Sequence, residues 1–101
     1  MPIATLFGRE VREAAGFPAR FLGLAYLDLD QVGSGLLIPA CSSVHTFGMR
    51  FALDIGFLDR DGGLLVVRSA IPAKRIVSCR EAGAVLEIPS SQGGEFWRLC
   101  H

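Results

Sequence analysis

The stretch FALDIGFLDRDGG, residues 51–63, gives the strongest indication of the fold because a strand signal is followed directly by a turn signal. Side chains along a strand alternate between its two faces. One face then takes Phe51, Leu53, Ile55 and Phe57, and the other takes Ala52, Asp54, Gly56 and Leu58. Both faces are mostly apolar, which favours a central strand. The turn residues DRDGG and the β-rich run at 64–68 complete a predicted hairpin.

Outside this hairpin, three apolar runs stop at an Ile-Pro dipeptide, at Pro39, Pro72 and Pro89. Proline cannot donate to a ladder and keeps the preceding residue extended, so each dipeptide marks a predicted strand end. Residues 11–14 add a further short strand.

Two segments carry helix signals. Residues 17–24 predict a brief helix whose single apolar edge covers the sheet. A last helix would start at Ser90 or Ser91, but Gly93 and Gly94 together cost about 2 kcal/mol relative to alanine, so this element stays open. With six or seven short strands, the chain predicts a mainly β fold with one or two short helices. We expect a small antiparallel, partly open barrel or curled sheet capped by a short helix.

Length and composition restrict the function classes. A chain of 101 residues fits a single domain over residues 1–101, and 50% hydrophobic residues allow a packed core. Ten basic residues balance ten acidic ones, so the overall field attracts neither nucleic acid nor a membrane surface. The apolar surplus leaves room for a homodimer contact.

The ends and the cysteines indicate a cytoplasmic protein. The first residues show no basic cluster before an apolar segment, and no apolar run approaches the roughly 20 residues of a membrane span. Cys41, Cys79 and Cys100 are odd in number and form no CxxC pair, which argues against a disulfide framework and a zinc knuckle. We expect free thiols and no cofactor.

Several segments resemble, in order, the motifs of the DUF192 family. The matching segments are residues 20–24 (RFLGL), 35–38 (GLLI), 44–49 (VHTFGM), 53–59 (LDIGFLD) and 85–89 (VLEIP). They are similar to the family's arginine and glycine-leucine motif, its GMLF strand, its SFWM segment, its PLDIIFLD strand and its closing VLELPAG. The resemblance spans residues 10–92, and several motifs in order are more specific than any one of them.

The chain departs from the family pattern at a strand entry and at a turn. Ala52 stands where the family usually has proline, Arg50 where it often has lysine, and Ser90 and Ser91 where it has alanine-glycine. The resemblance implies a compact, mainly β fold and no established activity.

The segment from Cys41 to Met49 contains one of the three cysteines, one of the two histidines and one of the two methionines of the chain. If residues 44–49 form a strand, His45, Phe47 and Met49 point to one side, and an imidazole and a thioether would share a pocket. With Cys41 and Cys79, these groups form a ligand set that suits a soft metal ion such as Cu(I). The two cysteines also invite a redox pair. The alternative, which we favour, is ordinary packing of a histidine, a methionine and two inert thiols.

Asp54 is the most informative charged residue because it lies in the middle of the predicted central strand. A buried carboxylate there needs a partner or a proton. We predict a structural ion pair with Arg20 on the covering helix, with Glu87 as a second acid on the closing strand.

These candidates lead to two functional predictions. The first is a non-enzymatic β domain that binds a small ligand or a protein through His45, Phe47, Met49, Arg50 and Asp54. The alternative is a redox or metal-binding protein that uses Cys41, His45 and Cys79. Residues 33–35 lack the lysine of a phosphate loop, which argues against a nucleotide enzyme. The basic run at 68–80 is interpreted as a solvated edge rather than a nucleic-acid groove.

Overall fold

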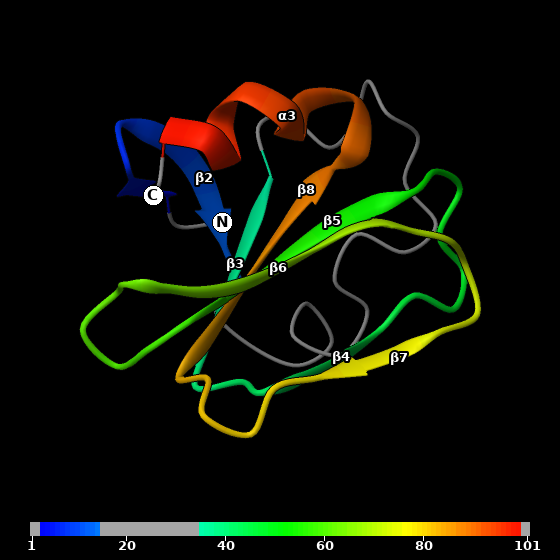
Figure 1. The fold of residues 1–101 in the computed structure, drawn as a ribbon, viewed down its shortest axis with the longest axis horizontal. Helices are drawn as coiled ribbons and strands as arrows, with labels where there is room; N and C mark the ends of the chain where they lie inside the picture. Colours follow the sequence, from blue (N-terminus) through cyan, green and yellow to red (C-terminus); the bar gives the residue numbers. More distant parts are fainter. Residues whose placement is uncertain (1–2, 15–34, 100–101) are drawn as a thin grey trace.

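The computed structural model describes residues 3–14 and 35–99, which form eight strands and one helix (Figure 1). The elements are β1 (Ile3–Leu6), β2 (Arg9–Glu13), β3 (Leu36–Pro39), β4 (Ser43–His45), β5 (Leu53–Leu58), β6 (Leu64–Ile71), β7 (Ile76–Ser78), β8 (Ala84–Pro89) and α3 (Ser90–Leu99). The mainly β prediction is confirmed, and all three predicted Ile-Pro strand ends coincide with the ends of β3, β6 and β8. The helix predicted at 17–24 lies outside the described residues. Within the described ranges, no helix is long and apolar enough to cross a membrane.

Two separate sheets form the body of the molecule. Six strands make a curled sheet in the order β1-β2-β3-β8-β5-β6, while β4 and β7 form a two-stranded ribbon. The sheet neighbours are antiparallel except β2 and β3, which run parallel. The sheets stay open, so the fold is the curled-sheet form of our expectation rather than a closed barrel.

The predicted central hairpin is confirmed. All six residues of β5 are buried, and β5 pairs with β6 on one side and β8 on the other. The turn is held by Asp59, whose Oδ1 accepts hydrogen bonds from the backbone N–H of Asp61 at 2.9 Å and of Gly63 at 2.8 Å. Gly62, at φ 86°, supplies the left-handed conformation that the turn requires.

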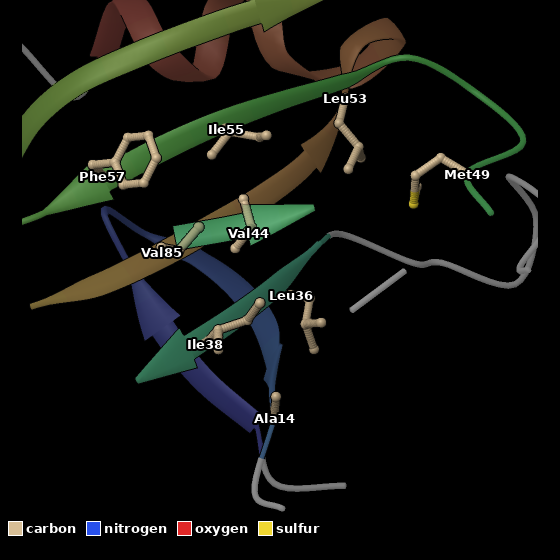
Figure 2. Close-up of a cluster of buried hydrophobic side chains, with 9 residues drawn as sticks. All are labelled: Ala14, Leu36, Ile38, Val44, Met49, Leu53, Ile55, Phe57 and Val85. Carbon is tan, nitrogen blue, oxygen red and sulfur yellow. The ribbon is translucent and has the colours of Figure 1, made fainter. Parts of the chain in front are cut away.

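Alternation along β5 and β8 builds a separate core on each face of the large sheet. One core faces the ribbon, whose Val44 points into it (Figure 2). Its buried members are Ala14, Leu36, Ile38, Val44, Met49, Leu53, Ile55, Phe57 and Val85. The other core lies under α3 and contains Val11, Leu86, Ile88, Phe96 and Trp97. The described part of the molecule is therefore layered as ribbon, large sheet and helix.

Helix α3 caps the sheet in spite of its two glycines. Its Gly93 packs so closely on β5 that an added Cβ would overlap the Asp54 carboxylate and come within 2.7 Å of Trp97 Nε1. A Cβ on Gly56 of β5 would likewise lie 2.7 Å from the Trp97 ring. Both glycines allow helix and strand to approach closely, and this packing offsets the unfavourable helix propensity that left the element open in the sequence.

Candidate functional site

Asp54 is a structural anchor for α3. Its carboxylate is 4% exposed, and its hydrogen-bond donors among residues 3–14 and 35–99 are neutral groups. Oδ1 accepts from the Ala70 backbone N–H and the Ser90 hydroxyl, each at 2.8 Å, and Oδ2 accepts from Trp97 Nε1 at 2.9 Å. Three donors compensate for the burial of this charge. Asp54 thus joins β5, β6 and α3.

The structure does not bring together Asp54 and Glu87, the two acids of the predicted ion pair. Asp54 pairs with Ile88 of the α3-side core, whereas Glu87 pairs with Ile55 of the ribbon-side core. The two carboxylates therefore point to opposite faces of the sheet, and Glu87 is 2% exposed. The third predicted member, Arg20, lies outside the described residues.

The remaining candidates in β4 and the residues that follow it divide into inward and outward side chains. Val44 and Met49, each 8% exposed, belong to the ribbon-side core. His45 is half-buried at the end of β4, and Phe47 is 47% exposed. Of the predicted pocket, His45 and Phe47 lie together on the surface, Met49 lies in the core beneath the ribbon, and Asp54 lies on the other face of the sheet.

His45 and Phe47 form one local unit. The Nδ1 atom of His45 accepts a hydrogen bond from the Phe47 backbone N–H at 3.2 Å, and the two ring centroids are 5.8 Å apart at an interplanar angle of 39°. Because Nδ1 accepts, the neutral imidazole carries its proton on Nε2. Across the ribbon, His45 pairs with Ile76, whose side chain is 70% exposed.

Alternation on the ribbon defines a surface that we call the outer ribbon face. Val44 and Val77 pair with each other and pack inward. Their neighbours Ser43, His45, Ile76 and Ser78 point outward. These four residues and the exposed Phe47, which follows β4 and whose ring lies beside that of His45, make up the outer ribbon face. The Ser43 and Ser78 hydroxyls hydrogen bond to each other at 2.8 Å, so the apolar exposure of this face is concentrated at Phe47 and Ile76.

Thr46, which is not among the site residues predicted from the sequence, joins the end of β4 to residues 72–75 through hydrogen bonds. It is 0% exposed. Its hydroxyl donates to the Pro72 carbonyl at 2.7 Å and accepts from the Arg75 N–H at 2.8 Å, while its own N–H donates to the Arg75 carbonyl at 2.8 Å. The Thr46 carbonyl accepts from the N–H of Lys74 at 3.3 Å. No local pattern marks this threonine, because its partners lie 26 to 29 residues away.

The two described cysteines are free, half-buried thiols. Both pack against the ribbon-side core, and their chain segments adjoin, since the Cys79 N–H donates to the Ser42 carbonyl at 2.9 Å. The thiols nevertheless bond elsewhere: Cys41 Sγ donates to the Ser43 carbonyl at 3.2 Å and Cys79 Sγ to Glu81 Oε2 at 3.6 Å. Within residues 3–14 and 35–99, no three His, Cys, Asp or Glu side chains lie close enough together to hold a metal ion. The predicted set of Cys41, His45 and Cys79 therefore does not form a metal site in this arrangement.

The described hollows lie away from most of the predicted pocket residues. The larger has a volume of about 330 Å³ and is lined by Ala40, Cys41, Ser42, Arg60, Ala82 and Gly83. A smaller one, of about 170 Å³, lies on β1 and β2 at Ile3, Glu10, Val11 and Arg12. Cys41 is thus the only member of the two predicted site sets that lines either of these hollows. The exposed Arg50 lines neither.

Comparison with known proteins identifies the family and the fold. The model of the DUF192 family, described as "Uncharacterized ACR", matches residues 5–96. No curated protein matches. A crystal structure of a candidate transcription regulator from Sinorhizobium meliloti 1021 is similar with a TM-score of 0.75 and 21% identity, over 94% of this chain and 82% of that one. A protein of unknown function from Novosphingobium aromaticivorans DSM 12444 is similar with a TM-score of 0.68 and 20% identity, over 96% and 74%. At this identity, both similarities concern the fold alone.

Proposed function

This chain belongs to the DUF192 family, and from that premise we propose that it is a non-enzymatic binding domain that contacts a partner protein through the outer ribbon face. The observation that carries the proposal is that two apolar side chains, Phe47 and Ile76, are exposed on the outer ribbon face. The end of the ribbon is held in place by the hydrogen bonds of the buried Thr46. The proposed location of the protein is the cytoplasm, where reducing conditions keep Cys41 and Cys79 as thiols.

The exposed side chains supply a favourable contact. Phe47 is 47% exposed, so a contact that covers it removes the remaining half of its surface from water, and aromatic residues dominate the centres of protein interfaces. Ile76 adds aliphatic area on the same face, opposite His45. A ribbon with its apolar groups pointing outward suits a protein surface better than a small ligand, which favours a concave site.

The rigidity of the ribbon end supports the same function. The hydrogen bonds of Thr46 to Pro72, Lys74 and Arg75 hold residues 46 and 72–75 in one arrangement. Phe47 is further restrained because its N–H donates to His45. Side chains that are ordered before association lose less conformational entropy on binding, so this face is suited to recognition.

The test compares capture of proteins from a lysate of the source organism by three immobilised forms of the domain. These are the wild type, the double variant Phe47→Ser with Ile76→Ser, and the control Leu65→Ser, which removes a side chain that is 43% exposed on β6. We expect at least one protein to be retained by the wild type and the control and lost by the double variant. In a purified system its affinity for the double variant should fall about tenfold or more.

Two outcomes would overturn the proposal. If every captured protein is retained equally by all three forms, the outer ribbon face is not the binding surface. If the wild type instead forms a concentration-dependent dimer that the double variant does not form, the face is occupied by a second copy of the chain. Sedimentation equilibrium on the same three proteins measures this.

A further inference from the structure

The outer ribbon face lies in a part of the sequence that contains cations but no carboxylates. Residues 41–53 and 64–80 include no Asp or Glu, and their basic residues are Arg50, Arg68, Lys74, Arg75 and Arg80. The chain as a whole carries ten residues of each sign, so the local excess of five positive charges is a property of these two segments. Charge of one sign around a contact surface selects partners of the opposite sign.

Two of these cations belong to residues whose backbone is hydrogen bonded to Thr46, the residue before Phe47. The N–H, carbonyl and hydroxyl of Thr46 all bond to the backbone of Lys74 or Arg75. Both cationic side chains are exposed. Arg75 Nη1 donates to the Ala73 and Lys74 carbonyls at 3.4 and 3.3 Å, which keeps the guanidinium on its own loop.

The backbone at this point is held in an uncommon conformation. Lys74 adopts φ 67°, in the left-handed region that non-glycine residues rarely enter. Such a conformation persists only where surrounding contacts determine it, and here those contacts include the Lys74 N–H bond to Thr46. The cations are therefore presented from a fixed loop rather than from a free chain.

We propose that the partner contributes a short, extended acidic segment, which sets an apolar side chain against Phe47 and Ile76 and its carboxylates against Lys74 and Arg75. This inference rests on the proposed function and specifies the partner at the same face. The strands of the ribbon are three residues long, or roughly 10 Å, which matches the length of a short stretch of extended peptide.

A peptide explains the surface better than a nucleic acid does. Single strands are held by stacking of successive bases on several aromatic rings. The outer ribbon face carries one phenylalanine, and its most exposed apolar group is the aliphatic Ile76, which offers no ring for stacking. In an extended peptide every second side chain points to the same side, so acidic residues followed by apolar residues at alternate positions match the cations and the apolar groups of this face together.

The experiment measures binding of fluorescein-labelled synthetic peptides by fluorescence anisotropy. The probe is ESDSFSLS, whose acidic and apolar residues share one face of the extended peptide; the neutral control is QSNSFSLS, and the control that lacks large apolar groups is ESDSASAS. A poly(dT) oligonucleotide serves as the nucleic-acid probe. The protein variants are Lys74→Glu, the double variant Lys74→Glu with Arg75→Glu, and the matched charge reversal Arg68→Glu on β6. The single Lys74→Glu variant leaves the Arg75 guanidinium bonds in place, and circular dichroism checks the fold of each protein.

We expect the wild type to bind ESDSFSLS more tightly than both control peptides. Affinity should fall about tenfold in the double variant and several-fold in Lys74→Glu, and should remain within about twofold in Arg68→Glu. An increase of the salt concentration from about 50 to about 500 mM should weaken binding several-fold, since exposed charges are screened.

The alternative outcomes separate the two proposals. If binding is lost in Phe47→Ser with Ile76→Ser but is unchanged by Lys74→Glu, Arg75→Glu and salt, the face binds a partner that is not acidic, and only the present inference fails. If neither the apolar nor the charge variants change peptide binding, both proposals fail. Tighter binding of poly(dT) than of the peptide would overturn the acidic-peptide assignment in favour of a nucleic acid.

Discussion

At the scale of single residues, the surroundings of Asp54 show how a buried charge can serve architecture without an ion pair on the described elements. Its three partners are a backbone N–H, a hydroxyl and an indole N–H, which arrive from β6 and from two positions of α3. Each bond to a charged acceptor contributes about 1.5–3 kcal/mol, so together they offset the loss of hydration. The position of Asp54 in the predicted central strand indicates that it needs a partner, but the partners on the described elements are neutral groups distant in the chain.

The first prediction concerns Asp54→Asn. An asparagine has the same size but replaces one acceptor by an NH₂ group, which would then face one of the three donors. We expect unfolding free energy to fall by about 2–3 kcal/mol and the melting temperature to fall by roughly 10 °C, measured by thermal and urea denaturation. The control Asp61→Asn changes an exposed turn residue and should be nearly neutral. Equal stability of the two variants would contradict the anchoring role.

At the scale of elements, α3 shows that a helix with poor propensity forms when tertiary contacts require it. Gly93 faces β5, where there is no room for a Cβ, whereas Gly94 has no atom within 4 Å of its Cβ position. Phe96 adds a second attachment, since its ring lies 6.2 Å from that of Phe7 in an edge contact and 5.2 Å from the Arg9 guanidinium. The two glycines thus have different reasons to be present.

A matched pair of substitutions follows from this difference. Gly93→Ala should destabilise the protein by about 1–3 kcal/mol, because the methyl group displaces the Asp54 carboxylate or Trp97. Gly94→Ala should stabilise it by about 0.5–1 kcal/mol, because alanine loses less backbone entropy in an exposed helix position. Urea titrations of both variants measure the difference. A stabilising effect at both positions would show that α3 does not pack against Asp54 as described.

At the scale of the whole molecule, the large sheet separates two sets of residues with different tasks. The α3 side contains Asp54 and Trp97 and holds the helix, while the opposite side supports the ribbon and its outer face. The predicted pocket combined residues from both sides. The layered structure instead leaves a surface at Phe47 and Ile76 as the candidate for binding.

The alternative function, a redox or metal-binding protein, is tested on the intact chain. Cys41 and Cys79 are half-buried, and each thiol donates a hydrogen bond to an acceptor other than the second cysteine. The Cys100→Ser variant leaves these two as the thiols to be measured. We expect both to react severalfold more slowly with a disulfide reagent in native protein than in denaturant. Metal analysis of protein equilibrated with Cu(I) and then dialysed should find less than about one tenth of an equivalent. Stoichiometric metal, or rapid formation of a Cys41–Cys79 disulfide, would support the redox or metal function and count against simple binding.

The sequence by itself determined the local elements and the family. Alternation over residues 51–58 and the turn at 59–63 specified the central hairpin, and the Ile-Pro dipeptides specified three strand ends, because strand periodicity and turn chemistry act between near neighbours. Ordered motifs along the chain specified DUF192. The same local rules identified His45, Phe47 and Asp54 as residues that required an explanation.

Only the tertiary structure decided which of these residues meet. The pairing of β5 with β8 turns Asp54 and Glu87 to opposite faces, and the pairing of β4 with β7 brings Ile76 beside His45 across 31 residues of chain. Thr46 and Gly93 acquire their roles in the same way, from partners that approach only after the sheets and the helix have packed. The physical reason is that alternation assigns a side chain to a face, whereas the neighbour on that face depends on strand order and register over the whole sheet.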